Sequence, residues 1–227
     1  MKKLVVLTGA GMSAESGLRT FREMGGLWEE YDVMEVASPE GWAKNMELVL
    51  RFYNERRKQL ESAKPNNGHT ALVKLEEYFD VQIITQNVDN LHERAGSKKV
   101  LHLHGILTRA RSTVDESIKY DIGYKELKKG DVCEKGSQLR PDIVWFGEMV
   151  PAIEEAAFLS SQADIYVIIG TSLNVYPAAG LVNYVPAGAP VYLIDPNPVY
   201  AGNRNIEIIS EGAGKGMEIL YKKLIDE

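Results

Sequence analysis

The chain has 227 residues, of which 32 are acidic and 26 basic, and its net charge of −6 argues against general affinity for nucleic acid. Its hydrophobic content of 44% allows a sizeable core in one large domain, with or without a small insertion. Cys133 is the sole cysteine in the sequence, which excludes an intrachain disulfide and a cysteine-based zinc site. The apolar run after Met1 is too short for a secretory signal or a membrane span, so we expect a cytoplasmic protein without membrane association.

The predicted elements alternate between strands and helices along the chain. Apolar runs predict strands at 1–10, 81–85, 100–104, 143–146, 165–169 and 190–194. Apolar spacing and turn residues predict helices at 40–60, 69–78, 152–162, 177–185 and 214–225. This order favours an α/β fold, a Rossmann-type doubly wound parallel sheet with a smaller inserted lobe. Within a single domain, we expect the sheet part at about 1–30, 78–105 and 140–227, and the lobe at about 31–77 and 106–139.

The first predicted strand ends in a glycine-rich turn. Its apolar residues stop at Gly9-Ala10-Gly11, and the small polar residues Ser13 and Ser16 follow. Glycines allow backbone N–H groups to approach a pyrophosphate, and a helix N-terminus adds a favourable dipole. An ordinary strand-to-helix turn is the alternative, and Gly-x-Gly patterns are too common for this segment to decide alone.

Three further apolar runs end in the same way. Continuous apolar runs suit parallel strands that are covered on both faces, and ligands bind beyond the carboxyl ends of such strands. The repetition is therefore a much stronger indication of a ligand site than one motif. The residues that follow these runs are Gln86, Asn87 and Asp89; Gly170, Thr171 and Ser172; and Asp195 and Asn197.

Together these residues resemble the sirtuin family of NAD-dependent protein deacylases. The resemblance runs almost end to end, and its motifs occur in the right order. It implies a Rossmann-type domain and a smaller lobe, with NAD and an acyl-lysine protein or peptide meeting in the cleft between them. The matching motifs are Gly9-Ala10-Gly11-x-Ser13-x-x-Ser16-Gly17 with Phe21-Arg22; Thr85-Gln86-Asn87-x-Asp89-x-Leu91-His92; His104-Gly105; Arg140-Pro141 with Val144-x-Phe146-Gly147-Glu148; and Gly170-Thr171-Ser172 with Pro177.

The resemblance also implies roles for individual residues. NAD would be a cosubstrate: nicotinamide leaves, and the acyl group passes to ADP-ribose. His104 would be the general base toward the ribose hydroxyls, a task that suits the pKa of histidine. Asn87 would order the ribose or a water, Asp89 would contact the nicotinamide amide, Gln86 would reach the ribose hydroxyls, and Phe21 would shield the reacting carbon. The other NAD-contacting residues that it implies are Gly9, Ala10, Gly11, Ser13, Ser16, Arg22, Gly170, Thr171, Ser172, Asp195, Asn197 and Ala213.

Structural alternatives accompany these roles. The Asn-x-Asp pair is also typical of a turn or a helix cap, and the serines and threonine could be simple N-caps. Of the other histidines, we expect His102 to be structural, since it would share a strand face with His104. We expect His69 to help position a helix start and His92 to support its loop.

Two residues of the helix expected at 40–60 indicate the substrate class. Tyr53 and Arg56 share one face of it, and an arginine with a tyrosine can bind a carboxylate. A charged helix surface is the alternative. The pair lies where one sirtuin subgroup recognises succinyl, malonyl or glutaryl groups, and Ala37 matches a small residue in that subgroup's acyl pocket. We therefore predict a desuccinylase or demalonylase that also accepts acetyl groups. The segment that would pair with the substrate peptide as an added strand comprises Val144, Phe146, Gly147 and Glu148.

One departure from the family concerns metal binding. Most sirtuins hold a structural zinc with four cysteines, whereas this chain has Cys133 alone, with Ser112 near the place of a first ligand. We expect no metal, and a lobe held by strand pairing around 119–122. Three rival functions are an NAD(P)-linked oxidoreductase, a mono-ADP-ribosyltransferase and a non-catalytic NAD or ADP-ribose sensor. The presence of His104, Asn87 and Asp89 favours the deacylase over the sensor.

Overall fold

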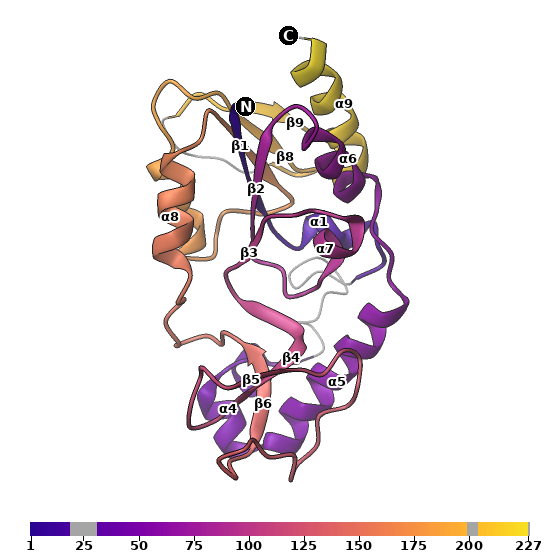
Figure 1. Ribbon diagram of the computed structural model, residues 1–227, viewed down its shortest axis with the longest axis vertical. Helices are drawn as coiled ribbons and strands as arrows, with labels where there is room; N and C mark the ends of the chain where they lie inside the picture. Colours follow the sequence, from indigo (N-terminus) through magenta and orange to yellow (C-terminus); the bar gives the residue numbers. More distant parts are fainter. Residues whose placement is uncertain (19–30, 199–203, 227) are drawn as a thin grey trace.

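A six-stranded parallel sheet forms the larger part of the molecule (Figure 1). The structure, a computed structural model, describes residues 1–18, 31–198 and 204–226. The strand order β3-β2-β1-β7-β8-β9 places β1 and β7 side by side at the centre, where the order of the strands reverses. The predicted doubly wound sheet is confirmed. Its strands are β1 (Lys3–Thr8), β2 (Asp80–Thr85), β3 (Val100–His102), β7 (Ile165–Ile169), β8 (Val191–Ile194) and β9 (Glu207–Ile209).

Helices cover both faces of this sheet. On one face α6 (Asn67–Leu75) and α9 (Ala213–Asp226) pack on alternate strand residues such as Val6. On the other face α8 (Ile153–Ser161) and a 3₁₀ helix, η1 (Ala178–Tyr184), pack on the intervening residues such as Val5. Because both faces are covered, the central strands carry continuous apolar runs, Leu4 to Leu7 in β1 and Ile165–Ile169 in β7, which made them visible in the sequence.

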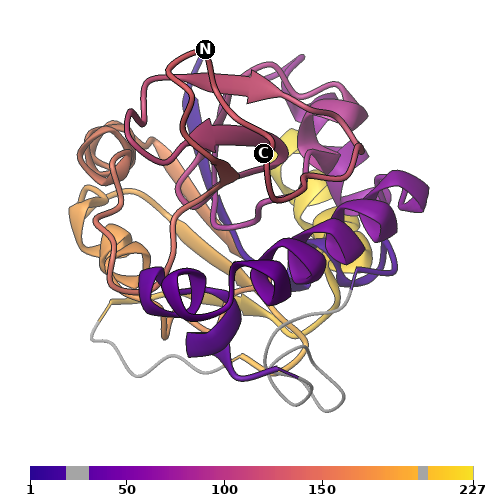
Figure 2. The ribbon, with the colours of Figure 1, turned by 90° about the horizontal axis from the view of Figure 1, so that it is seen from below.

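A second lobe lies below the sheet in Figure 1. It contains a three-stranded antiparallel sheet in the order β5-β4-β6, beside which α4 and α5 cross the molecule when it is seen from below (Figure 2). Short helices α1 (Gly11–Ala14) and α7 (Leu91–Ala95) lie near the carboxyl edge of the large sheet. The elements of the lobe are α3 (Val33–Val36), α4 (Pro39–Lys44), α5 (Met46–Ser62), β4 (Gly105–Ser112), β5 (Lys119–Asp121) and β6 (Leu139–Ile143).

Several predicted boundaries were wrong. The helix expected at 40–60 is two helices, because Asn45 ends α4 and its side chain accepts a hydrogen bond from Leu48 N at the start of α5. The helix at 177–185 is a 3₁₀ helix, and the one at 69–78 ends at Leu75. The strand expected at 143–146 is β6, Leu139–Ile143, which belongs to the small sheet, so residues 140–143 lie outside the parallel sheet.

The buried histidines His69 and His92 have structural positions. His69 Nδ1 accepts the N–H of Asn66 at 3.3 Å and completes the N-terminal cap of α6, and burial lowers the pKa of His69 to about 4. The His92 ring lies 4.8 Å from the His69 ring, and its Nε2 lies 3.2 Å from Thr8 Oγ1 at the end of β1. These contacts join α6, α7 and β1 beneath the carboxyl edge of the sheet. Among the helices that the structure describes, none is long and apolar enough to cross a membrane.

Candidate active site

The glycine-rich turn after β1 packs against the turn after β7. Gly9 N donates to the carbonyl of Ile169 at 3.0 Å, and Gly11 N donates to that of Gly170 at 2.9 Å. A Cβ atom on Gly9 would lie 2.7 Å from the Gly170 oxygen, and one on Gly11 would lie 2.7 Å from the Gly170 Cα. The glycines are therefore required by the close approach of two backbones. The sequence suggested a different reason, the approach of a pyrophosphate to free N–H groups.

Gly170 offers a test of this packing. It has a φ of +60°, and a Cβ atom there would collide with the backbone of Gly11 and Met12. We expect Gly170→Ala to lower the free energy of unfolding by about 3 kcal/mol, through backbone strain and overpacking, and to raise the KM for NAD. Gly123 has a φ of +53° but open space around it, so Gly123→Ala isolates the strain. Urea unfolding of both variants gives the comparison; equal losses would refute the packing argument.

Asn87, Asp89 and Ser13 form a buried hydrogen-bonded group at this edge. The Asn87 side-chain amide donates to Gly9 O at 3.0 Å and to Ser13 Oγ at 3.2 Å. Ser13 Oγ in turn donates to Asp89 Oδ2 at 2.9 Å, while Asp89 Oδ1 accepts the N–H of Leu91 at 3.0 Å. Burial raises the pKa of Asp89, and these hydrogen bonds only partly oppose it. The structure thus brings together three predicted site residues, one from α1 and two from the loop after β2.

His104 follows β3 and lies half-buried in front of β4. Its Nδ1 lies 3.0 Å from the carbonyl oxygen of Gln86. Because a carbonyl only accepts, Nδ1 carries the ring hydrogen, and Nε2 of the neutral ring keeps its lone pair. Burial lowers the pKa of His104, and the hydrogen bond to Gln86 offsets only part of this effect. The ring is therefore neutral at pH 7, as a general base must be.

The other predicted NAD-contacting residues lie along the same edge with partners of their own. The Gln86 side-chain amide donates to Thr171 Oγ1 at 3.0 Å and so links the turns after β2 and β7. Ser172, next along the chain, is exposed. Beyond β8, Asp195 Oδ1 accepts the N–H of Asn197 at 2.8 Å in a turn. Phe21 and Arg22 lie outside the described residues.

The glycine turn also meets the start of α9. Ala213, the first residue of α9, is buried, and Gly214 N donates to Glu15 Oε1 at 3.0 Å. Ser16, next to Glu15, accepts a hydrogen bond from Asn66 Nδ2 at 3.1 Å. Glu15 was missed in the sequence, although an acidic residue facing a helix N-terminus is favourable. No local pattern indicated that α9 begins beside Glu15, since Gly214 lies 199 positions further along the chain.

A pocket joins these residues to the helical part of the lobe. Arg56 on α5 lines it together with Asn87 and Asp89, so the predicted acid-binding residue meets two predicted NAD-contacting residues. Gln59, one turn further along α5, also lines it and was not predicted. Of the residues that the structure describes, those that line the pocket are Ala10, Ser13, Leu18, Arg56, Gln59, Leu60, Asn87, Val88, Asp89 and Leu107.

Tyr53 and Ala37 belong to the buried cluster behind this pocket. The Tyr53 side chain is 4% exposed, and its hydroxyl accepts a hydrogen bond from Trp145 Nε1 at 3.0 Å. Burial raises the pKa of Tyr53 to about 12, so the hydroxyl keeps its hydrogen. Ala37 packs in the same cluster, and its carbonyl accepts the N–H of Phe146 at 2.9 Å. The sequence indicated no role for Trp145, the unspecified position of the Val144-x-Phe146 motif, whose indole N–H fixes the Tyr53 oxygen.

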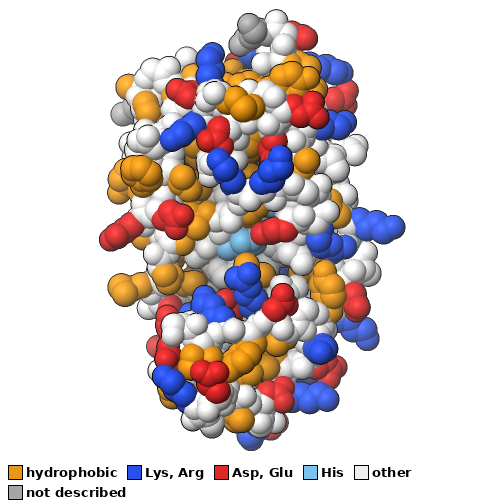
Figure 3. All heavy atoms as spheres, viewed as in Figure 1, with side chains coloured by type: hydrophobic (Ala, Val, Ile, Leu, Met, Phe, Trp, Pro, Cys, Tyr) orange, Lys and Arg blue, Asp and Glu red, His pale blue; other side chains and the backbone are white. Residues whose placement is uncertain are grey.

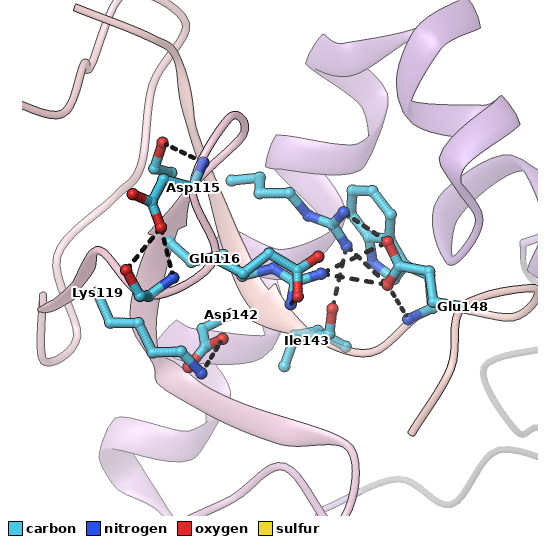
Figure 4. A network of polar contacts seen from close by, with 11 residues as sticks. Asp115, Glu116, Lys119, Asp142, Ile143 and Glu148 are labelled. Carbon is cyan, nitrogen blue, oxygen red and sulfur yellow. Dashed lines mark hydrogen bonds and ion pairs between the residues drawn. The ribbon is translucent and has the colours of Figure 1, made fainter. Parts of the chain in front are cut away.

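Glu148 is held by cations of the small sheet (Figure 4). Its carboxylate accepts from Arg140 Nη1 at 2.7 Å, from Arg111 Nη2 at 3.3 Å and from Trp145 N at 2.8 Å. Burial raises the pKa of Glu148, but Arg140 and the other donors lower it by more. The Arg140 guanidinium also donates to the carbonyl of Ile143 and lies 3.3 Å from the Trp145 ring centroid. This network shapes the segment of Val144, Phe146 and Gly147, in which Val144 N donates to the His104 carbonyl at 3.0 Å.

A cluster of small polar side chains lies where the resemblance places the zinc module. Ser112 Oγ and Ser137 Oγ are 2.9 Å apart, and Cys133 Sγ lies 3.4 Å and 3.1 Å from them. The hydrogen bonds with both hydroxyls lower the pKa of Cys133 to about 7. Among the described side chains, no group of three or more His, Cys, Asp or Glu residues is placed to hold a metal ion. The predicted pairing near 119–122 is confirmed, since β5 pairs with β4.

The fold and the site define a dinucleotide-binding protein with a second lobe, whose catalytic candidates lie between the two parts. In Figure 3, histidine atoms reach the surface at the middle of the face, between these two parts. The family model described as the Sir2 family matches residues 9–177. An NAD-dependent protein deacylase of Bacteroides thetaiotaomicron is 58% identical, with 99% of each chain covered.

Solved structures agree with this match. A Sir2 homologue in complex with NAD has a TM-score of 0.89 and 39% identity, covering 99% of this chain and 90% of that one. A Sir2 enzyme with a deacetylated p53 peptide and 3′-O-acetyl ADP-ribose has a TM-score of 0.83 and 32% identity, covering 97% and 92%. The chain therefore belongs to the Sir2 family of NAD-dependent protein deacylases.

Proposed function

We propose that this deacylase removes negatively charged acyl groups, succinyl or malonyl, from lysine side chains, and that it also accepts acetyl. The observation that carries the proposal is the position of Arg56, which lines the same pocket as Asn87 and Asp89. Arginine binds carboxylates with two parallel hydrogen bonds, which an acetyl group cannot accept. A tyrosine, Tyr53, lies one helical turn before Arg56 on α5, with its hydroxyl oriented by Trp145.

The residues at the carboxyl edge suit NAD. Asn87, Asp89 and Ser13 supply buried amide, carboxylate and hydroxyl groups around the pocket, a donor and acceptor set that matches an amide and a sugar. NAD supplies the electrophilic ribose carbon, with nicotinamide as leaving group and ADP-ribose as acyl acceptor. In the proposed mechanism His104 Nε2 accepts a proton from a ribose hydroxyl, and Nδ1 stays fixed to the Gln86 carbonyl.

The peptide would lie along Val144, Phe146, Gly147 and Glu148. Phe146 and Gly147 are exposed in the loop after β6, while Arg140 holds the Glu148 side chain inward. Backbone pairing with such a segment demands little of the substrate sequence, which suits an enzyme that recognises the acyl group. We also propose that the hydrogen-bonded cluster of Ser112, Cys133 and Ser137 stabilises the lobe in place of zinc.

Mass spectrometry of matched acetyl-, succinyl- and malonyl-lysine peptides tests the proposal. We expect NAD-dependent loss of the succinyl and malonyl groups, with nicotinamide and acyl-ADP-ribose as products. Loss of acetyl alone would discard the acidic substrate class. Transfer of ADP-ribose to protein would support the transferase rival, and the absence of any reaction would favour a sensor.

A further inference from the structure

His102 lies on β3 beside the loop that carries the predicted catalytic residues. In the parallel pairing of β2 with β3, His102 is opposite Thr85, so residues 86–88 continue next to the segment that follows His102. Residues 102–107 form hydrogen bonds with three successive carbonyls of the loop after β2. The bonds are His104 Nδ1 with Gln86 O at 3.0 Å, His102 Nδ1 with Asn87 O at 3.1 Å, and Leu107 N with Val88 O at 2.7 Å.

Both ring nitrogens of His102 face oxygen acceptors. Nδ1 lies 3.1 Å from the Asn87 carbonyl, and Nε2 lies 2.7 Å from Glu93 Oε1 on α7. Burial raises the pKa of Glu93, but the hydrogen bond and charge of His102 lower it by more, so Glu93 is ionised at neutral pH. A carbonyl and a carboxylate have no hydrogen to donate, and a neutral imidazole has one N–H. Both bonds together therefore need the imidazolium form of His102.

Several charged groups surround His102. Its side chain is 7% exposed and lies near two carboxylates, Glu93 and Asp89. Burial raises the pKa of Asp89, and the charge of His102 opposes this effect. His92, on α7, is neutral, because burial and the nearby histidines lower its pKa well below the usual value. The charge of Arg109 on β4 also lowers the pKa of Glu93.

We propose that His102 is a positioning residue of the deacylase site: as an imidazolium held by Glu93, it donates to the Asn87 carbonyl and fixes the loop of Asn87 and Asp89. The proposal rests on the proposed contacts of Asn87 and Asp89 with NAD. His104 holds the preceding carbonyl, of Gln86, so two histidines on alternate positions hold adjacent peptide groups. One of them is neutral and is the proposed base, and the other is charged and orients the loop.

NMR of protein labelled with ¹⁵N-histidine tests the charge directly, without any substrate. At neutral pH we expect both ring nitrogens of His102 to carry hydrogen, assigned by their loss in His102→Gln. In Glu93→Gln one of the two should lose its hydrogen. A singly protonated His102 ring in the unaltered protein at neutral pH would overturn the proposal.

Kinetics test the positioning role. Glutamine at position 102 carries no charge, and both of its N–H donors lie on one nitrogen, so His102→Gln should lower kcat/KM for NAD about tenfold or more. For Glu93→Gln, we expect the ratio of its kcat/KM to that of the unaltered enzyme to rise toward one as the pH is lowered, because acid restores the hydrogen that the His102 ring has lost.

Glu218→Gln, which removes a surface ion pair with Lys222 on α9, is the matched control and should show a ratio near one at every pH. A pH-independent ratio for Glu93→Gln would indicate a merely structural role and sink the proposal. If the unaltered enzyme removes no acyl group, the proposed function fails, while the NMR result still decides the protonation of His102.

Discussion

Replacing His104 with tyrosine should abolish acyl transfer while the protein remains folded. A general base contributes roughly 10² to 10⁴ in rate, and tyrosine, with a pKa near 10, cannot accept the proton at neutral pH. Steady-state turnover of an acylated peptide gives the measurement, with circular dichroism and NAD binding as controls for folding. Near-normal turnover would refute the assignment of the base.

The pH profile of the unaltered enzyme gives a second, independent check on His104. Burial lowers the pKa of His104, so the ring becomes protonated only at lower pH than an exposed histidine. Activity should therefore fall as the pH drops through this lowered pKa, and the fall should begin below the usual range of histidine. A fall that begins above this range would mean that another group limits the rate.

The large sheet could be predicted because its strands carry their own signal. Val5 and Val6 point to opposite faces, and both faces are covered by helices, so β1 is apolar at each position from Leu4 to Leu7. The carboxyl ends of β1, β2 and β7 also lie together by topology, which makes their polar turns one site. Local composition therefore indicated both the architecture and the edge that holds the candidate residues.

The small sheet was harder to predict for an equally physical reason. Strand β6 is buried, yet it contains Arg140 and Asp142, which a sequence pattern assigns to the surface. Arg140 is paired with Glu148, and Asp142 is paired with Lys119 at 3.0 Å. Partners that lie outside the strand make these buried charges tolerable, and no periodicity reveals them. The same limit applies to the pocket, where an α5 side chain meets the loop after β2 only in the folded chain.

Replacing Arg56 with methionine should damage desuccinylation far more than deacetylation. A hydrogen bond to a charged group contributes about 1.5 to 3 kcal/mol, so we expect kcat/KM for succinyl-lysine to fall roughly 10- to 100-fold. The acetyl group of acetyl-lysine has no carboxylate, so it makes no such hydrogen bond with Arg56. Its kcat/KM should therefore change by less than about threefold. The quantity that decides is the ratio of the two values, because it cancels any general loss of active enzyme.

Two other variants on α5 sharpen this comparison. Arg51 is an exposed arginine on the same helix, so Arg51→Met controls for the loss of a positive charge and should leave the ratio unchanged. Tyr53→Phe removes one hydroxyl that Trp145 orients and should shift the ratio in the same direction as Arg56→Met, by less, since one neutral donor is lost. Equal losses on both substrates for Arg56→Met would mean that Arg56 shapes the pocket it shares with Asn87 and Asp89 without recognising the acyl carboxylate.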